Sequence, residues 1–310
     1  MFFFNIFSTK RDFSEPIRKA YEWANKELIS LILIEEQLFQ RLKSIKHYFF
    51  IELGDFFLHF LDAAEDELSK ILKTVSKEKL ESLLEISIRT SSANSDPFKD
   101  DLVCDLYQYT LVEQVFAMQN VNGPNESNFF LDNKNNILTP SGNIKGIEAF
   151  TLDYKVKWPL NLIISRKCLT KYQILFRHLF YCKYVEKQLC NTWLLHQSTK
   201  ELNVQKMFIS SYGLTQRMLN FSKNLVYNMS YEVLERKWIK FENEFKNVQN
   251  FDDLINLHNN FLDDCLKESL ILDQNLLKNL SKINNTCLIF SRIIQSFTNN
   301  MKFTDIFPYV

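Results

Sequence analysis

Apolar residues recur at intervals of three and four positions along most of the chain, which is the spacing of one face of an α-helix. Ser14 and Pro16 stand at the start of the first such stretch and favour a helix N-terminus there. Asp55 is placed to cap a later helix, and Gly213 is the one interruption in the longest stretch. The pattern predicts helices over residues 14–31, 36–51, 55–68, 77–89, 101–118, 166–195, 201–245, 251–272 and 275–299.

One passage has a different periodicity. From Phe150 to Trp158 apolar and polar residues alternate, and a second apolar run, Leu160–Ile164, follows Pro159. Alternation with a period of two is typical of a half-buried strand. We therefore predict one small β-hairpin near residues 150–164 in an otherwise all-α, multi-helix bundle.

The segment 120–143 is unlike its surroundings, because it contains eight Asn, two Gly, two Pro and few aliphatic residues. Such a composition does not supply a face that can be buried. We expect an Asn-rich loop or insert over residues 119–146, within one domain that covers residues 1–310.

Composition supports the helical prediction and narrows the function classes. The 310 residues include only 5 Gly and 6 Pro, too few turn residues for a doubly wound or all-β protein, and 28 Phe that can fill a helical core. The formal net charge of +0 argues against nucleic acid as a partner, and no uncharged apolar run approaches the roughly 20 residues needed to enter a membrane. The six Cys form no CxxC pair, which indicates reduced, mostly buried thiols in an intracellular protein.

Charged residues are unevenly distributed along the chain. Residues 155–187 hold eight basic side chains and one acid, whereas 52–67 hold six acids and 242–268 hold seven acids and two lysines. Two interpretations stay open. The three stretches are solvated helix faces that offset one another, or the basic stretch faces an acidic protein partner.

Three groups of carboxylates raise the alternative of an all-α, Mg²⁺-dependent enzyme, because this hard cation binds several carboxylate oxygens. The groups are Asp100, Asp101 and Asp105; Asp252 and Asp253; and Asp263, Asp264 and Glu268. Their spacing is DDxxxD rather than DDxxD, and no Arg-rich diphosphate clamp accompanies them. Solvated helix faces are therefore the favoured interpretation.

His178 and Cys182 are four positions apart and would share a helix face, as two zinc ligands do. No second pair stands at a suitable spacing, so buried core positions are favoured over a metal site. The sequence also lacks the phosphate-binding and nucleophile motifs of common enzymes. We therefore predict no catalytic residue, no metal and no cofactor.

Four segments are more particular than a generic helical sequence. Gly54–Leu68 reads GDFFLHFLDAAEDEL, Leu152–Leu160 reads LDYKVKWPL, Ile164–Gln173 reads ISRKCLTKYQ, and Phe176–Cys190 reads FRHLFYCKYVEKQLC. Together they resemble the C-terminal half of the gamma-tubulin complex components. The resemblance extends from about Ser14 to Phe297 and is weakest over residues 70–148.

Within that family, the run Phe176–Lys183 and the segment His258–Lys267 are most similar to the second component of the gamma-tubulin small complex. The resemblance implies a non-catalytic helical module with gamma-tubulin and other complex components as partners. It implies microtubule nucleation as the process, and the cytoplasm, the cytoskeleton and microtubule-organising centres at spindle poles or centrosomes as the location. The chain lacks the N-terminal half of the family, so we expect a fragment, a truncated gene model or a shortened paralogue.

Five basic residues are our candidates for the gamma-tubulin contact: Lys155, Lys157, Arg166, Lys167 and Lys171. The last three open a predicted helix, where cations oppose the helix dipole and so need another reason to be present. Two alternatives to gamma-tubulin docking stay open at this point, the Mg²⁺-dependent enzyme and a helical structural tether that does not bind gamma-tubulin.

Overall fold

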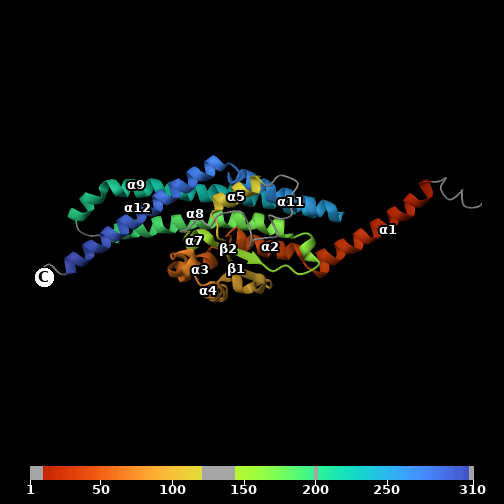
Figure 1. The fold of residues 1–310 in the computed structure, drawn as a ribbon, viewed down its shortest axis with the longest axis horizontal. Coiled ribbons are helices and arrows are strands. Elements are labelled where there is room, and N and C mark those ends of the chain that lie inside the picture. The colour runs from red at the N-terminus through yellow and green to blue at the C-terminus, as the bar shows by residue number, and fades with distance from the viewer. Residues whose placement is uncertain (1–9, 121–143, 199–201, 307–310) are drawn as a thin grey trace, which may run out of the picture.

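Long helices lie side by side along one axis and give the molecule an elongated shape (Figure 1). The computed structural model describes residues 10–120, 144–198 and 202–306. The predicted all-α class is confirmed, because in these ranges the only sheet has two strands. The predicted insert over residues 119–146 lies mostly outside them.

Most of the long helices agree closely with the predicted ranges. They are α1 (Lys10–Ser30), α2 (Leu38–Phe49), α3 (Gly54–Leu68), α4 (Lys77–Thr90), α5 (Leu111–Asn120), α7 (Gly146–Ala149), α8 (Arg166–Ser198), α9 (Leu202–Tyr227), α10 (Arg236–Phe245), α11 (Phe251–Glu268) and α12 (Gln274–Ile306). Two π-helical segments, η2 (Leu31–Glu35) and η7 (Asn228–Glu235), and four short 3₁₀ turns, η3 (Leu72–Thr74), η4 (Ser92–Ser95), η5 (Lys99–Asp101) and η6 (Leu160–Leu162), complete the set.

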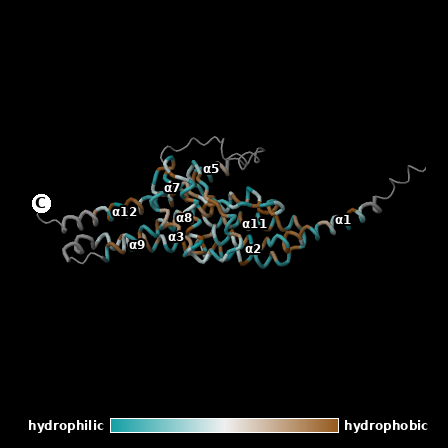
Figure 2. The backbone as a smooth tube through the Cα atoms, turned by 90° about the horizontal axis from the view of Figure 1, so that it is seen from below, coloured by the Kyte–Doolittle hydropathy of each residue, from teal (hydrophilic) through white to brown (hydrophobic). Residues whose placement is uncertain are grey.

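Helix α8 runs through the middle of the molecule and contacts β2 and the helices α2, α5, α7, α9, α11 and α12. Helices α9 and α12 pack along it, and α3, α4 and the sheet form a lobe on one side (Figure 1). Helix α1 extends from the body at the end opposite to the far ends of α9 and α12. Apolar segments gather mainly where the helices lie together in the body (Figure 2). No helix of the described residues combines the length and the apolar character needed to cross a lipid bilayer.

The strand predicted from residue 150 is present, but its partner is not the segment after Pro159. Strands β1 (Leu102–Leu106) and β2 (Phe150–Tyr154) pair antiparallel, with Leu102 opposite Tyr154. The apolar run 160–164 forms the turn η6 and its continuation. The small sheet therefore joins two segments that are distant in sequence instead of forming a local hairpin.

The predicted helix over residues 101–118 is correspondingly wrong in its first half. Leu102 and Cys104 are two positions apart and are both buried, as alternate residues on one side of a strand are. Helix α5 begins only at Leu111 because Thr110 and Glu113 form a reciprocal capping box. The Thr110 amide donates to Glu113 Oε2 at 2.8 Å, and the Glu113 amide donates to Thr110 Oγ1 at 3.3 Å.

Three predicted helix boundaries also differ. Helix α1 begins at Lys10, so Ser14 lies inside it and is not its cap. Asp55 lies in the first turn of α3, where its carboxylate accepts hydrogen bonds from the amide and hydroxyl of Ser92 at 2.7 and 2.9 Å. Gly213 does not interrupt α9, because a helix tolerates an isolated glycine at a modest cost in free energy.

Aromatic side chains fill the centre of the core. Phe176 and Phe180 of α8 lie 5.2 Å apart between ring centroids, and Phe150 of β2 packs on both. Phe57 of α3 meets Phe180 edge-on at 5.6 Å. Phe56, Phe57 and Phe60 of α3 are 5%, 5% and 2% exposed. Burial of these rings is what holds α3 and the sheet against α8.

Two residues that follow helix C-termini have the left-handed backbone conformation, although neither is glycine. Ile51 follows the end of α2 with φ 53°, and Leu270 follows the end of α11 with φ 61°. This left-handed conformation at a helix C-terminus usually falls to glycine, because a side chain there is strained.

Candidate functional site

Lys155 and Lys157, two of the five predicted contact residues, lie in the loop that follows β2. Both side chains are exposed, and neither forms an ion pair with a described residue. The Lys155 amide donates to the Asp101 carbonyl at 2.8 Å, which holds the start of the loop against η5. Trp158 is 75% exposed, and its peptide bond to Pro159 is cis. The loop therefore presents two cations beside a large apolar ring.

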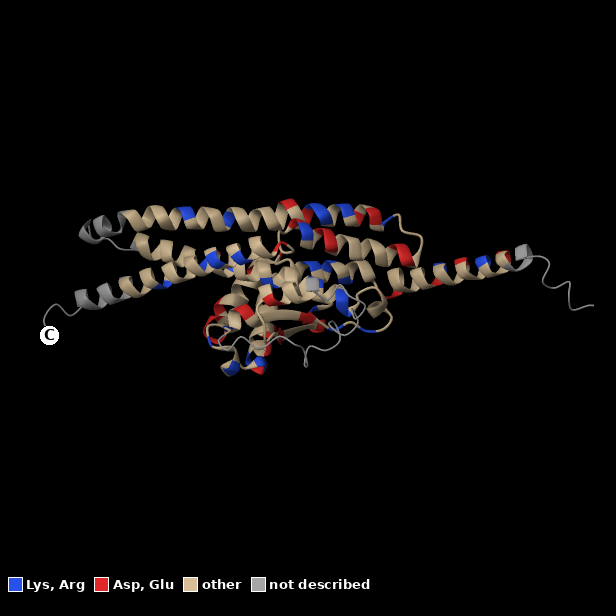
Figure 3. Cartoon of the chain, turned by 45° about the horizontal axis from the view of Figure 1, so that its top comes forward, with Lys and Arg blue, Asp and Glu red and all other residues tan. Residues whose placement is uncertain are grey.

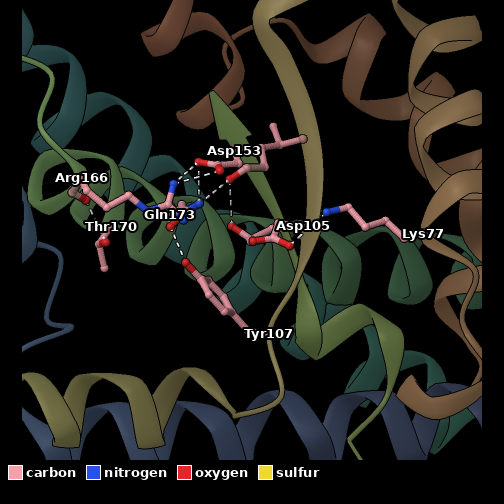
Figure 4. A network of polar contacts seen from close by, with 9 residues as sticks. Lys77, Asp105, Tyr107, Asp153, Arg166, Thr170 and Gln173 are labelled. Carbon is pink, nitrogen blue, oxygen red and sulfur yellow. Dashed lines mark hydrogen bonds and ion pairs between the residues drawn. The ribbon is translucent and has the colours of Figure 1, made fainter. Parts of the chain in front are cut away.

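Arg166, at the start of α8, forms an ion pair within the fold. Its Nη1 atom lies 2.7 and 2.9 Å from the two carboxylate oxygens of Asp153 in β2. Gln173 donates to the same carboxylate at 3.2 Å and accepts the Tyr107 hydroxyl at 2.5 Å (Figure 4). Burial disfavours the charged guanidinium, but the hydrogen bond and ion pair with Asp153 outweigh it and raise the pKa of Arg166. Arg166 therefore ties α8 to the sheet.

Lys171 is also paired. Its ammonium lies 2.6 Å from Asp263 Oδ1 of α11, and only 13% of its side chain is exposed. The side chain of Lys167 is exposed. The structure does not gather the five predicted residues into one unpaired patch, since Arg166 and Lys171 already have acidic partners.

Further along α8, other members of the basic stretch are neutralised or buried. Arg177 is 3% exposed and donates to Gln114 Oε1 at 2.6 Å and to two backbone carbonyls. Lys187 pairs with Asp62 and with Glu65 of α3, the latter at 3.3 Å. For Lys187 the acidic stretch 52–67 of the same chain therefore supplies the counter-charges, whereas Arg177 is satisfied by uncharged acceptors.

Of the carboxylate groups considered for Mg²⁺, the first lies on η5 and β1, and the other two lie at opposite ends of α11. Most of their members are in ion pairs at 3.3 Å or less: Asp101 with Arg41, Asp105 with Lys77, Asp263 with Lys171, and Asp264 and Glu268 with Lys237. Within the described ranges, no three carboxylate, His or Cys side chains gather in a way that could hold a metal ion. This arrangement does not provide the clustered oxygens that the enzyme alternative requires.

His178 and Cys182 share a face of α8, and both are buried. Burial lowers the pKa of His178 to about 4 and raises the pKa of the Cys182 thiol to about 12. Asn284 of α12 donates to Cys182 Sγ at 3.6 Å. A neutral imidazole and a protonated thiol packed against α12 agree with the core interpretation of this pair.

A second basic surface, on α9 and α12, was missed by the sequence reasoning. Where the structure describes the side chains of these helices, five basic ones are exposed and form no ion pair with a described residue: Arg217, Lys223, Lys278, Lys282 and Arg292. Helix α9 contains no Asp or Glu, and α12 contains none before Asp305 (Figure 3). The signal in the sequence is therefore a shortage of acids over two long helices, which a search for runs of basic residues does not find.

Two of these bases flank an apolar groove of about 370 Å³ between the two helices, which we call the α9–α12 groove. Arg217 and Lys282 stand at its sides, and Phe221 and Ile283 contribute apolar surface, 40% and 42% exposed. Unpaired cations around exposed apolar side chains are typical of surfaces that bind an acidic protein.

Comparison with known proteins decides the family. A family model described as "Gamma tubulin complex component C-terminal" matches residues 38–305. The chain belongs to the gamma-tubulin complex component family. The matched range begins with α2 and ends in the last turn of α12. It therefore includes both the loop at Lys155 and the α9–α12 groove.

Individual relatives agree with the family model. The chain is 42% identical over 295 residues to gamma-tubulin complex component 2 of Mus musculus and 37% identical over 291 residues to gamma-tubulin complex component 2 of Arabidopsis thaliana. It is 33% identical over 328 residues to the spindle pole body component alp4 of Schizosaccharomyces pombe. The expected family membership, with its greater similarity to the second component, is confirmed. Each alignment covers 94% of this chain but only 32%, 41% and 42% of the respective relatives.

Proposed function

We propose that this chain is a non-catalytic binding module that docks gamma-tubulin and, with other gamma-tubulin complex components, supports microtubule nucleation at microtubule-organising centres and spindle poles. The observation that carries the proposal is the family match over residues 38–305. The names of the relatives support it, because they describe gamma-tubulin complex components and a spindle pole body component. The role is proposed for the helical region that these relatives share with the chain.

The α9–α12 groove is the surface that we propose for the main gamma-tubulin contact. Arg217 and Lys282 have no acidic partner in the described part of the chain, so an approaching carboxylate does not have to displace one. Phe221 and Ile283 add apolar area that a partner can bury. Arg166 and Lys171 are less suited, because each would first have to leave its ion pair.

Lys155, Lys157 and Lys167 form the second surface that we propose for gamma-tubulin. Their exposed side chains keep the sequence-based hypothesis open for this part of the set. The exposed ring of Trp158 beside Lys157 adds a side chain of the kind that often dominates binding energy at protein interfaces. The two surfaces predict different mutational effects and can therefore be separated.

Purified gamma-tubulin is titrated against the wild-type chain and two charge-reversal variants. In the α9–α12 variant, Arg217 and Lys282 are replaced by Glu. In the second variant, called the loop variant, Lys155 and Lys157 of the loop and Lys167 of α8 are replaced by Glu. We expect the α9–α12 variant to bind at least about tenfold more weakly, and the loop variant to show a smaller loss. Matched controls carry Arg18→Glu and Lys19→Glu, or these two with Lys26→Glu, on the exposed helix α1.

A larger loss in the loop variant than in the α9–α12 variant would reverse the order of the two surfaces. A folded wild-type chain that does not bind gamma-tubulin at all would overturn the proposed function and favour the structural tether. Mg²⁺-dependent turnover that disappears when Asp263 and Asp264 are replaced by Asn would favour the enzyme alternative.

A further inference from the structure

Helix α1 extends from the body of the molecule, and we call its exposed residues 14–24 the α1 arm (Figure 1). Because all of these residues are exposed, the body covers little of their apolar surface. Arg18 pairs with Glu22 and Lys19 pairs with Glu15, each at 3.5 Å, so these charges join residues within the arm. Such pairs support the helix but do not hold it to the rest of the chain.

Polar contacts join this part of α1 to the N-terminal turn of α11. Asn25 Nδ2 donates to Asn250 Oδ1 at 3.1 Å, and the Phe251 amide donates to Asn25 Oδ1 at 3.0 Å. The Tyr21 hydroxyl donates to Asp252 Oδ2 at the longer distance of 3.4 Å. These contacts connect segments that are at least 225 residues apart in sequence.

Asn25 completes the N-terminal cap of α11. The amides of the first turn of a helix have no partner within the helix, and the side chain of the N-cap residue usually accepts from one of them. The N-cap residue of α11 is Asn250, whose side chain does not cap the helix in this way. It donates instead to Asp253 Oδ2 at 2.7 Å. Asn25 therefore supplies, from another helix, an acceptor for one of these amides.

The C-terminal end of α1 is anchored in the core by apolar side chains. Ile29 is 9% exposed, and Ile32 of the π-helical segment η2 is fully buried. A π-helical turn is one of the usual places at which a helix bends. The arm is therefore fixed at one end by burial, whereas Asn25 and Tyr21 hold it against α11 through hydrogen bonds.

The docked position of the arm is favoured only weakly. The hydrogen bonds of Tyr21 with Asp252 and of Asn25 with Asn250 are exposed to solvent. Water competes for exposed hydrogen bonds, so their net contribution to the free energy is small. Since the arm also buries little apolar surface, positions away from α11 lie close in free energy to the docked one.

We propose that the α1 arm has a docked and a released state, and that Asn25 is the residue that selects the docked state. On release, Asn25 leaves Asn250 and the Phe251 amide, and the arm moves away from α11 while Ile29 and Ile32 stay buried. The direction of the exposed apolar side chains of α1 then depends on the contacts of one asparagine. The proposal does not depend on gamma-tubulin binding.

Spin-label distances in the full chain test this proposal. Labels on Lys19→Cys of the arm and Asn256→Cys of α11, both exposed positions, are measured by double electron–electron resonance. The background carries Cys190→Ser, because the other native cysteines are buried. We expect a narrow distance for the docked state and a minor, broad set of distances for the released state. Asn25→Ala should raise the ratio of released to docked chains about fivefold or more, because two hydrogen bonds that favour the docked state are lost.

Hydrogen–deuterium exchange gives a second measurement. The Phe251 amide should exchange about fivefold or more faster in the Asn25→Ala chain, since it loses its acceptor. Lys26→Ala, at the next and exposed position of α1, is the matched control and should change neither the distances nor the exchange. Unfolding midpoints establish that each variant is folded. Wild-type distances in a folded Asn25→Ala chain, an equal change in the Lys26→Ala chain, or no populated docked distance in the wild type would each overturn the proposal.

Discussion

The Lys171 ammonium lies 2.6 Å from the Asp263 carboxylate and joins the basic stretch of α8 to the acidic stretch of α11. The lysine side chain is 13% exposed and the aspartate 59%, so solvent screens the pair on one side only. Lys171 was expected to contact gamma-tubulin. Because its ammonium is paired within the fold, we expect it to stabilise the folded chain instead.

Replacing Lys171 by Met should therefore lower the free energy of unfolding by about 1 kcal/mol, with little effect on gamma-tubulin affinity. Adding Asp263→Asn to that variant should cost little more, because the pair is already broken. Urea unfolding of the wild type, the two single variants and the double variant gives the interaction free energy between Lys171 and Asp263. Lys267→Met, at an exposed position of α11, is the control. A Lys171→Met chain with wild-type stability and weakened gamma-tubulin binding would restore Lys171 as a contact residue.

Glu67 is the centre of a second set of internal charges. Its side chain is 2% exposed and accepts hydrogen bonds from Lys70 at 2.7 Å, from Lys79 at 2.9 Å and from the Ser76 amide at 3.2 Å. These contacts, with that of Lys70 the largest, lower the pKa of Glu67 from 4.5 to about 2. Because the folded-state pKa is the lower one, the stabilisation is complete above pH 4.5 and is lost as the pH falls towards 2.

Glu67→Gln should consequently lower the unfolding midpoint at neutral pH, and the curves of the variant and the wild type should converge below pH 4.5. Thermal unfolding followed by circular dichroism between pH 7 and pH 3 measures this. Glu85→Gln, which removes an exposed partner of Arg89, is the control and should have a small effect. A constant difference across the whole range would contradict the assigned role of the Glu67 charge.

Two buried histidines should make the chain sensitive to milder acid. Burial lowers the pKa of both His178 and His258 from 6.5 to about 4. The unfolded chain then binds protons at a higher pH than the folded one, so stability falls as the pH drops from 6.5 to 4. Each histidine should remove roughly 3 kcal/mol across this window.

His258 lies 3.1 Å from the buried Tyr172 hydroxyl, and His258→Gln keeps a polar side chain that can meet it. This variant should flatten the loss of stability between pH 6.5 and 4, whereas His59→Gln at an exposed position should leave it unchanged. Urea titrations at several pH values provide the comparison. An equally steep loss in the His258→Gln chain would show that His258 does not titrate with unfolding.

The sequence predicted most of the helices because each needs only its own apolar stripe. Strand β1 was missed since Leu102–Leu106 is five residues long and fits helical and strand spacing equally well. Its partner strand lies beyond the Asn-rich segment, and local periodicity holds no information about a pairing between distant segments. The capping box of Thr110 and Glu113 was present in the sequence and could have placed the start of α5.

The candidate site was harder to predict, because the chain order of charges does not show which are paired. Lys171 and Asp263 are far apart in sequence, and only the packing of α8 against α11 makes them partners. Arg217 and Lys282 are also distant, and only the packing of the helices brings them to one groove. The five predicted residues formed a cluster in sequence, whereas the structure engages Arg166 and Lys171 in ion pairs with other elements of the chain.

The left-handed Leu270 gives a test of backbone strain. Its φ is 61° and its side chain is 44% exposed, so a glycine there would relieve strain and lose little buried area. Leu270→Gly should raise the free energy of unfolding by up to about 1 kcal/mol, after the entropy that glycine loses on folding is included. Leu270→Ala keeps the Cβ atom and is the matched control without this gain. A glycine variant no more stable than the alanine variant would argue against strain at this position.

Gamma-tubulin affinity should depend on salt concentration if Arg217 and Lys282 form the main contact. Fluorescently labelled gamma-tubulin is titrated with the wild-type chain at low and at high ionic strength, and the same titration is made with the Arg217→Glu, Lys282→Glu variant. The wild type should bind saturably and more weakly as salt increases, and the variant should bind more weakly and with less dependence on salt. A folded wild-type chain that does not bind gamma-tubulin, or a variant that binds with wild-type affinity and salt dependence, would contradict this expectation.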